Sequence, residues 1–173
     1  SRDQGLSYRL LHFINSAAFG LRSKVGSVGQ ALPLLGLVRL RQWLMAALLS
    51  DMADSPKGSE LTLRSVHRGR YLELLARSMP KAPYLDETMF MLGMFSLLDA
   101  LLSQPMAEIA RGLPLEDDLA AALLGEKSKA APWLEHVRDI EQGHWNRVTA
   151  FLSKEGVELK DGARNHARAH RWA

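Results

Sequence analysis

The sequence predicts an all-α fold, organised as a single multi-helix globular domain. Apolar residues recur at spacings of three and four in several segments, which places them on one face of a helix. No segment alternates convincingly between apolar and polar residues, as a half-buried strand would. With 173 residues, the chain is long enough to bury a full core within one domain.

The N-terminal third predicts three helices and one loop. The first helix covers residues 6–19 and is followed by Gly20, in the position where a left-handed residue ends a helix. Ser27 is placed to cap a short helix, residues 28–35, which Gly36 ends. A longer helix follows from Leu37. The stretch "DSPKGSE", residues 54–60, is typical of a loop, and two subdomains could meet there.

Further helices follow at regular intervals. Residues 62–79 predict an amphipathic helix with a basic outer face, which Pro80 and Pro83 stop. Asp86 is placed to cap a helix at residues 88–102, which is apolar on nearly every side and is therefore expected in the middle of the domain. Shorter helices are predicted at residues 106–111, 115–124, 133–141 and 145–154, and a solvated helix at the C-terminus.

Composition excludes several classes of protein. Cysteine is absent, which excludes disulfide scaffolds, thiolate zinc sites and cysteine nucleophiles, and favours a cytoplasmic location. The net charge of +3 is spread along the chain and is too small to indicate a nucleic-acid partner. The longest apolar stretch, residues 89–102, is shorter than the roughly 20 residues of a membrane span. We expect neither nucleic acid nor a membrane as partner.

The sequence lacks the common motifs of phosphate, acyl-transfer and zinc sites, so no cofactor is predicted. His166 and His170 are four residues apart and could face one ion, but no Asp or Glu stands nearby as a third ligand. A solvated helix is therefore favoured there over a metal site. The group of Arg64, His67 and Arg68 could bind a phosphate or an acidic partner, although a solvated helix face is favoured.

Ser96 and Asp99 are the most informative polar residues, because they interrupt the apolar helix at residues 88–102. A buried carboxylate must be paired or hydrogen-bonded, so the pair indicates either a polar pocket or a satisfied internal contact, of which the second is favoured. Asn15 and Ser16 interrupt the first apolar run in the same way. We expect all four side chains to be mostly buried and hydrogen-bonded.

Residues 6–44 resemble the opening of HDOD domains. The resemblance rests on "NSAAFG", residues 15–20, followed by Ser27, Ala31, Leu32, Leu35 and Gly36. Residues 90–125 and the C-terminal part resemble the HDOD half of bacterial proteins that join an EAL-type domain to it. The resemblance implies that residues 1–173 form an HDOD-like helical domain with an HD-like bundle. It also implies a fragment that lacks N-terminal helices and an upstream EAL-type domain.

The resemblance implies a non-catalytic role. HDOD domains are similar to the HD phosphohydrolases, whose metal centre needs a Gly-x-x-His-Asp pattern, whereas this chain has Ser96-Leu97 after Gly93. The implied function is an output or regulatory module in cyclic-di-GMP or related signalling. Its expected partner is an adjacent EAL-type domain or a second copy. The alternative is a degenerate HD-type phosphohydrolase that uses His67 or His12 with Asp99. For Asn15 and Ser16, a structural role is favoured over ligand contact.

Overall fold

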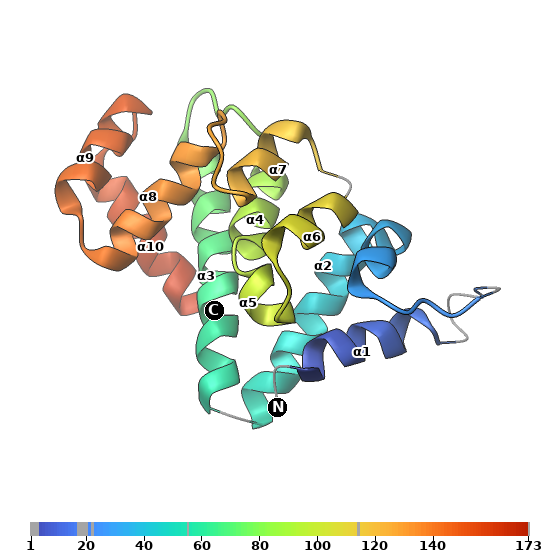
Figure 1. Ribbon diagram of the computed structural model, residues 1–173. Helices are drawn as coiled ribbons and strands as arrows, with labels where there is room; N and C mark the ends of the chain where they lie inside the picture. Colours follow the sequence, from blue (N-terminus) through green and yellow to red (C-terminus); the bar gives the residue numbers. More distant parts are fainter. Residues whose placement is uncertain (1–3, 17–20, 22, 55, 114, 173) are drawn as a thin grey trace. The chain divides into compact units, whose positions relative to one another are not determined.

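The computed structural model describes residues 4–16, 21, 23–54, 56–113 and 115–172. Within these residues it contains helices and no strand, so the all-α prediction is confirmed (Figure 1). The helices are α1 (Gln4–Ile14), α2 (Val28–Asp54), α3 (Pro56–Ser78), α4 (Asp86–Phe95), α5 (Leu98–Leu102), α6 (Met106–Gly112), α7 (Asp117–Leu123), α8 (Ala131–Gln142), α9 (Trp145–Lys154) and α10 (Leu159–Trp172).

The helices are divided between two compact units, and each unit is built from two separate stretches of chain. The first unit is Ser1–Thr62 with Leu97–Glu116, and the second is Leu63–Ser96 with Asp117–Ala173. The first therefore holds α1, α2, α5 and α6. The second holds α4, α7 to α10 and most of α3.

The first unit is centred on α2, which packs against α1 and α6. Gly36 lies inside α2 with a φ of +69°, so the short helix ends there and a second helical segment follows, as predicted. At the start of α2, Ser27 Oγ accepts a hydrogen bond from the N–H of Gln30, and Gln30 Oε1 accepts one from the N–H of Gly26. This reciprocal arrangement resembles a capping box and satisfies two backbone donors.

Two boundaries in this part of the chain differ from the prediction. The first helix ends at Ile14 and not near Phe19, because Asn15 and Ser16 already form a turn. Phe19 and the predicted terminator Gly20 lie outside the described residues. The predicted loop at residues 54–60 is also wrong for the most part, since α3 begins at Pro56. Proline favours the first position of a helix, where its missing N–H costs nothing.

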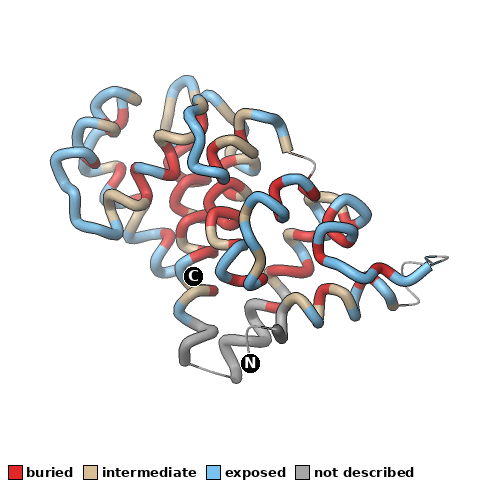
Figure 2. The backbone as a smooth tube through the Cα atoms, viewed as in Figure 1, coloured by how far each residue is buried: buried red, intermediate tan, exposed pale blue. Residues whose placement is uncertain are grey.

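The second unit is organised around a close contact between α3 and α4. A Cβ added at Gly93 would lie 2.6 Å from the backbone of Arg68 and Gly69, and one added at Gly69 would lie 2.7 Å from the carbonyl oxygen of Phe90. The hydroxyl of Ser65 donates to the carbonyl of Met94 at 2.8 Å. Buried residues concentrate along these two helices (Figure 2). The prediction that the apolar segment at residues 88–102 is central therefore holds for α4.

The predicted helix at residues 88–102 is divided into two. α4 ends at Phe95, Ser96 follows as its C-cap, and α5 begins only at Leu98. The break arises because the Ser96 hydroxyl donates to the carbonyl of Gly93 at 2.6 Å and competes for the acceptors of the last turn.

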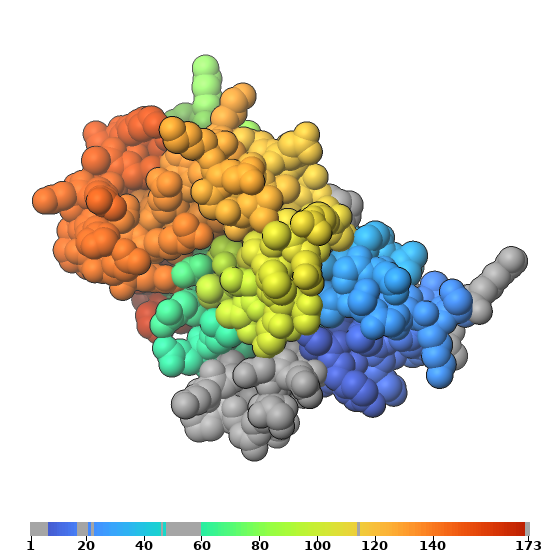
Figure 3. All heavy atoms as spheres, in the orientation of Figure 1, coloured from blue at the N-terminus to red at the C-terminus, as the bar shows by residue number. Residues whose placement is uncertain are grey.

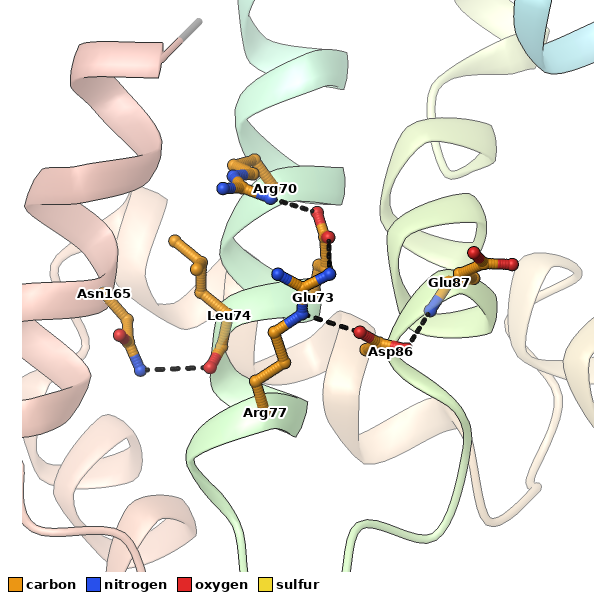
Figure 4. A network of polar contacts seen from close by, with 7 residues as sticks. All are labelled: Arg70, Glu73, Leu74, Arg77, Asp86, Glu87 and Asn165. Carbon is orange, nitrogen blue, oxygen red and sulfur yellow. Dashed lines mark hydrogen bonds and ion pairs between the residues drawn. The ribbon is translucent and has the colours of Figure 1, made fainter.

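Asp86 does not cap α4 as predicted. Leu85 occupies the N-cap position without a side-chain hydrogen bond, and Asp86 is the first helical residue. The Asp86 carboxylate instead accepts hydrogen bonds from Arg77 Nε at 2.6 Å and from the N–H of Glu87 (Figure 4). The bond from Arg77 holds the pKa of Asp86 below its ordinary value.

Helices α8, α9 and α10 form the C-terminal part of the second unit. Trp133, Leu134 and Val137 of α8 are buried. Helix α9 packs against both α8 and α10. Gly162 of α10 lies against Leu152 of α9, where a Cβ would lie 2.7 Å from a methyl carbon. Atoms of residues 131–154 gather on one face in the space-filling view (Figure 3). Among the described residues, no helix has both the length and the apolar character that a membrane crossing requires.

Replacing Gly93 by alanine tests the α3–α4 contact. We expect Gly93→Ala to lower the free energy of unfolding by about 3 kcal/mol, because the added methyl group meets backbone atoms that cannot move aside. Urea denaturation followed by circular dichroism measures this difference. Gly29→Ala is the control, because open space surrounds the Cβ position, and a shift within about 0.5 kcal/mol is expected. Equal stability of the two variants would contradict the contact.

Candidate functional site

Asn15 and Ser16 follow α1 directly and begin the connection to α2. The Asn15 amide makes two hydrogen bonds with one residue: Nδ2 donates to the carbonyl of Val25 at 2.9 Å, and Oδ1 accepts from its N–H at 2.8 Å. The N–H of Ser16 donates to the carbonyl of Phe13. Asn15 is exposed and Ser16 is half-buried, so the expected burial is wrong for Asn15. The Asn15 side chain thus joins the end of α1 to the backbone of Val25, ahead of α2, which supports a structural role.

Ser96 and Asp99 do not share one helix face as predicted. Ser96 is buried at the end of α4, whereas Asp99 lies on α5 and is exposed. The expectation of a buried, paired carboxylate is therefore wrong for Asp99. The helix is interrupted between the two residues, at Ser96 and Leu97, so a spacing of three no longer places them on one helix face. Each of the predicted pocket residues has its own local surroundings.

The second unit contains a buried ionic contact at Ser96. Arg68 of α3 donates two parallel hydrogen bonds to Glu141 of α8, from Nε at 2.8 Å and from Nη2 at 2.6 Å. Its remaining nitrogen, Nη1, donates to Ser96 Oγ at 2.9 Å. The side chain of Arg68 is 7% exposed and that of Glu141 is 26% exposed. We call these three residues the arginine latch.

The arginine latch changes the interpretation of the predicted basic face. Arg64 is exposed as expected, but Arg68 is buried and His67 is half-buried, so these residues do not form one solvated face. An acidic side chain does bind Arg68, but it is Glu141 of the same chain. The sequence contains a signal for this burial: Ser65, Arg68, Leu72 and Leu75 are spaced by three, four and three residues, and all are buried on one stripe of α3.

The charge beside Ser96 determines what this position can bind. A guanidinium group stays protonated and has no lone pair for a metal ion. Because Arg68 lies within hydrogen-bond distance of the Ser96 hydroxyl, a divalent cation bound there would lie against a positive charge. The Arg68 guanidinium can orient the Ser96 hydroxyl and hold the Glu141 carboxylate. These groups together are unsuited to bind a metal ion.

A group of aromatic and imidazole rings lies beside the latch. We call His67 of α3 with His166 and His170 of α10 the histidine cluster, because the His67 ring centre lies 4.7 Å from that of His166 and 5.7 Å from that of His170. Tyr71 lies 5.6 Å from His166 and exchanges a 2.8 Å hydrogen bond with His136 of α8.

Burial dominates the protonation of these rings. Desolvation lowers the pKa of His67 and of His166, and the neighbouring imidazoles lower it further. Desolvation also lowers the pKa of His136 to about 4 and raises the pKa of the buried Tyr71 hydroxyl. The prediction of a wholly solvated C-terminal helix is thus wrong for one face of α10. Sequence reasoning identified His67, His166 and His170 but did not identify Tyr71, His136 or Glu141.

The histidine cluster does not form a metal centre in this geometry. Over the described part of the chain, no group of three or more His, Asp or Glu side chains is arranged to hold a metal ion. The two α10 histidines do approach a third imidazole, and the Tyr71 ring lies beside both His67 and His166.

Comparison with known proteins identifies the family. The family model described as the HDOD domain matches residues 1–123. This chain belongs to the HDOD domain family. The HDOD chain is 35% identical to the uncharacterized protein YuxH of Bacillus subtilis over 147 residues, which are 84% of this chain and 36% of that protein. It is 31% identical over 173 residues to the cyclic di-GMP phosphodiesterase CdgJ of Vibrio cholerae, covering 100% of this chain and 40% of that protein.

The extent of the match bears on the site. The HDOD chain spans about two fifths of the length of these curated relatives. No solved structure was found to match it. The family model ends at residue 123, so α8, α9 and α10 follow the matched segment. Three residues that contact α3 therefore lie beyond the part of this HDOD chain that the family model matches: His136, Glu141 and His166.

Removing the carboxylate of the arginine latch should destabilise the second unit. We expect Glu141→Ala to lower the free energy of unfolding by about 2 kcal/mol, because it leaves the Arg68 guanidinium buried without its partner. Glu158→Ala, which breaks an exposed pair with Lys160, should cost no more than about 0.5 kcal/mol. Urea denaturation of both variants measures the contrast, and similar losses would show that Arg68 is effectively solvated.

A second prediction concerns the connection after α1. Asn15→Ala removes both hydrogen bonds to Val25 and should lower the free energy of unfolding by about 1–2 kcal/mol. Asn146→Ala on the exposed surface of α9 serves as the matched control and should have little effect. An Asn15→Ala variant that unfolds at the parental urea concentration would exclude a structural role for the amide.

Proposed function

We propose that this HDOD chain is a non-catalytic output or regulatory module of a bacterial signalling protein, which acts through protein–protein contacts. The observation that carries the proposal is the hydrogen bond from Arg68 to Ser96. By resemblance to HD phosphohydrolases, Ser96 and Leu97 occupy the positions of the metal-binding His-Asp pair. A serine hydroxyl and a leucine side chain do not replace those ligands, and the adjacent guanidinium opposes a cation.

The signalling context of the proposal rests on the relatives. CdgJ, which this chain matches along its whole length, is a cyclic di-GMP phosphodiesterase. The match covers 40% of CdgJ, so in that protein the corresponding segment is joined to a larger remaining part. We propose that this chain serves cyclic-di-GMP or related signalling in the cytoplasm, with catalysis supplied by a different domain.

The proposed partner is an EAL-type domain or a second copy of the chain. A module without its own chemistry must transmit its state through a surface, and helix faces are the surfaces that an all-α fold offers. The first unit exposes large apolar side chains on two helices, Tyr8 on α1 and Val38 on α2. These two side chains are therefore the first to substitute in an experiment that maps the partner-binding surface.

The catalytic part of the proposal predicts no hydrolysis and no resident metal. The purified chain should not hydrolyse cyclic di-GMP or bis-p-nitrophenyl phosphate above the buffer rate when Mn²⁺, Fe²⁺ or Zn²⁺ is supplied. Elemental analysis should show metal far below one ion per chain. An active EAL-type phosphodiesterase provides the positive control. Near-stoichiometric metal together with turnover that His67→Ala or Asp99→Ala abolishes would instead establish the degenerate phosphohydrolase.

The interaction part of the proposal has a separate experiment. Light scattering tests self-association, and interferometry tests binding to the part of CdgJ that lies outside the matched segment. One of the two should give a dissociation constant tighter than about 100 μM. Tyr8→Glu or Val38→Glu should weaken it, whereas Leu85→Glu on the second unit is the control. Absence of both interactions would contradict a protein-contact function.

A further inference from the structure

Helix α10 is held against α3 by polar and small side chains. Asn165 is buried, and its Nδ2 donates to the Leu74 carbonyl at 3.3 Å (Figure 4). The same nitrogen donates to Ser78 Oγ at 3.1 Å. The other buried side chain of the helix that the structure describes is the methyl group of Ala169. Because the buried face of α10 contributes little apolar area over the described residues, polar contacts carry a large share of its docking.

The histidine cluster lies in this interface. His67 projects from α3 toward α10, and His166 meets it edge to face at 4.7 Å. His166 also meets the Tyr71 ring, which lies beneath it on α3. His170 approaches His67 from one turn further along α10. Three imidazoles therefore lie together at the contact of α3 with α10, with His67 and His166 half-buried and His170 exposed.

The surroundings of the cluster contain little negative charge to compensate for protonation. Glu141 is the carboxylate that faces His67 and His166, and it is already bound to Arg68. Asp139 faces His136 and is bound to His144 and Arg147. Other carboxylates on the packed helices are also paired with arginines: Glu73 of α3 binds Arg70 and Arg77, and Asp161 of α10 binds Arg164.

We propose that the histidine cluster is an acid-sensitive switch: its protonation releases α10 from α3 while α3 and α4 stay packed. The charged imidazoles would repel one another across the interface, and α10 has little apolar contact to oppose that repulsion. The α3–α4 contact is made by glycine backbone, by the hydroxyl of Ser65 and by the Arg77–Asp86 ion pair. Arg77 holds the pKa of Asp86 below its ordinary value, so this carboxylate stays charged over the same pH range. This inference does not depend on the proposed function.

The direction of the pH effect follows from the pKa values. The pKa of His67 and of His166 lies below that of free histidine, so the docked state favours the neutral rings. The contribution of the neutral His67 and His166 rings to the docking of α10 is complete above about pH 6.5. It is lost as the pH falls towards the lowered pKa of the docked state. Acidification from pH 7.5 to pH 5 therefore begins above the ordinary pKa of histidine and extends into the range in which the docked state is destabilised.

Hydrogen exchange measured by mass spectrometry tests the switch on the whole chain. After correction for the intrinsic rate, protection of residues 159–172 should fall at least about tenfold between pH 7.5 and pH 5.0. Protection of α4 should fall less. His67→Gln combined with His166→Gln should abolish this selective loss, because glutamine stays neutral. His166→Lys, which carries the charge permanently, should reproduce the loss at pH 7.5.

His12→Gln is the matched control, because His12 is an exposed histidine on α1, outside the second unit. It should retain the pH response of α10. The switch is overturned if residues 159–172 keep their protection at pH 5.0, if α4 loses protection to the same degree, or if the double glutamine variant responds like the parent. Should the double variant fold poorly, the response of His166→Lys at pH 7.5 decides the matter by itself.

Discussion

The close approach of α3 and α4 at Gly69 and Gly93 is the constraint on which the second unit depends. Two helix backbones can come this near only where neither has a side chain at the crossing point. That approach brings Ser65 within reach of the Met94 carbonyl and places Ser96 beside Arg68. The glycine of the Gly-x-x-Ser-Leu stretch thus has a packing role, which does not require a metal centre three residues later.

The arginine latch extends this packing to the C-terminal helices. A buried ion pair adds little net stability compared with apolar side chains of the same size, but it is strongly directional. Both oxygens of Glu141 are matched to two nitrogens of Arg68, and the third contact goes to Ser96. The position of α8 on α3 is therefore specified by geometry more than by buried area. Because the carboxylate comes from beyond residue 123, the family core acquires this specification from the segment that follows it.

The sequence predicted several helix limits from local signals, although the stretch at residues 54–60 is mostly helix and not a loop. It also failed where a distant residue decides. Gly36, Pro80 and the limits of α9 follow from glycine and proline positions and from apolar periodicity. The break after Phe95 has no such marker, since it depends on a serine hydroxyl that also accepts from Arg68. Once the helix divides there, the exposure of Asp99 follows. Arg68 was assigned to the solvated face because its partner Glu141 lies 73 residues away, and one sequence does not show that pairing.

The polar contacts that join α8 and α10 to α3 include an ion pair and a group of imidazoles, and these two differ in how they respond to pH. An arginine–glutamate pair keeps both charges between about pH 5 and 8, whereas an imidazole changes its charge within that range. α8 carries the glutamate and also buries Trp133 and Val137, so its attachment is both apolar and ionic. α10 carries two of the clustered histidines, and among its described side chains only Asn165 and Ala169 are buried. Mild acid therefore leaves the attachment of α8 intact, whereas it weakens the attachment of α10.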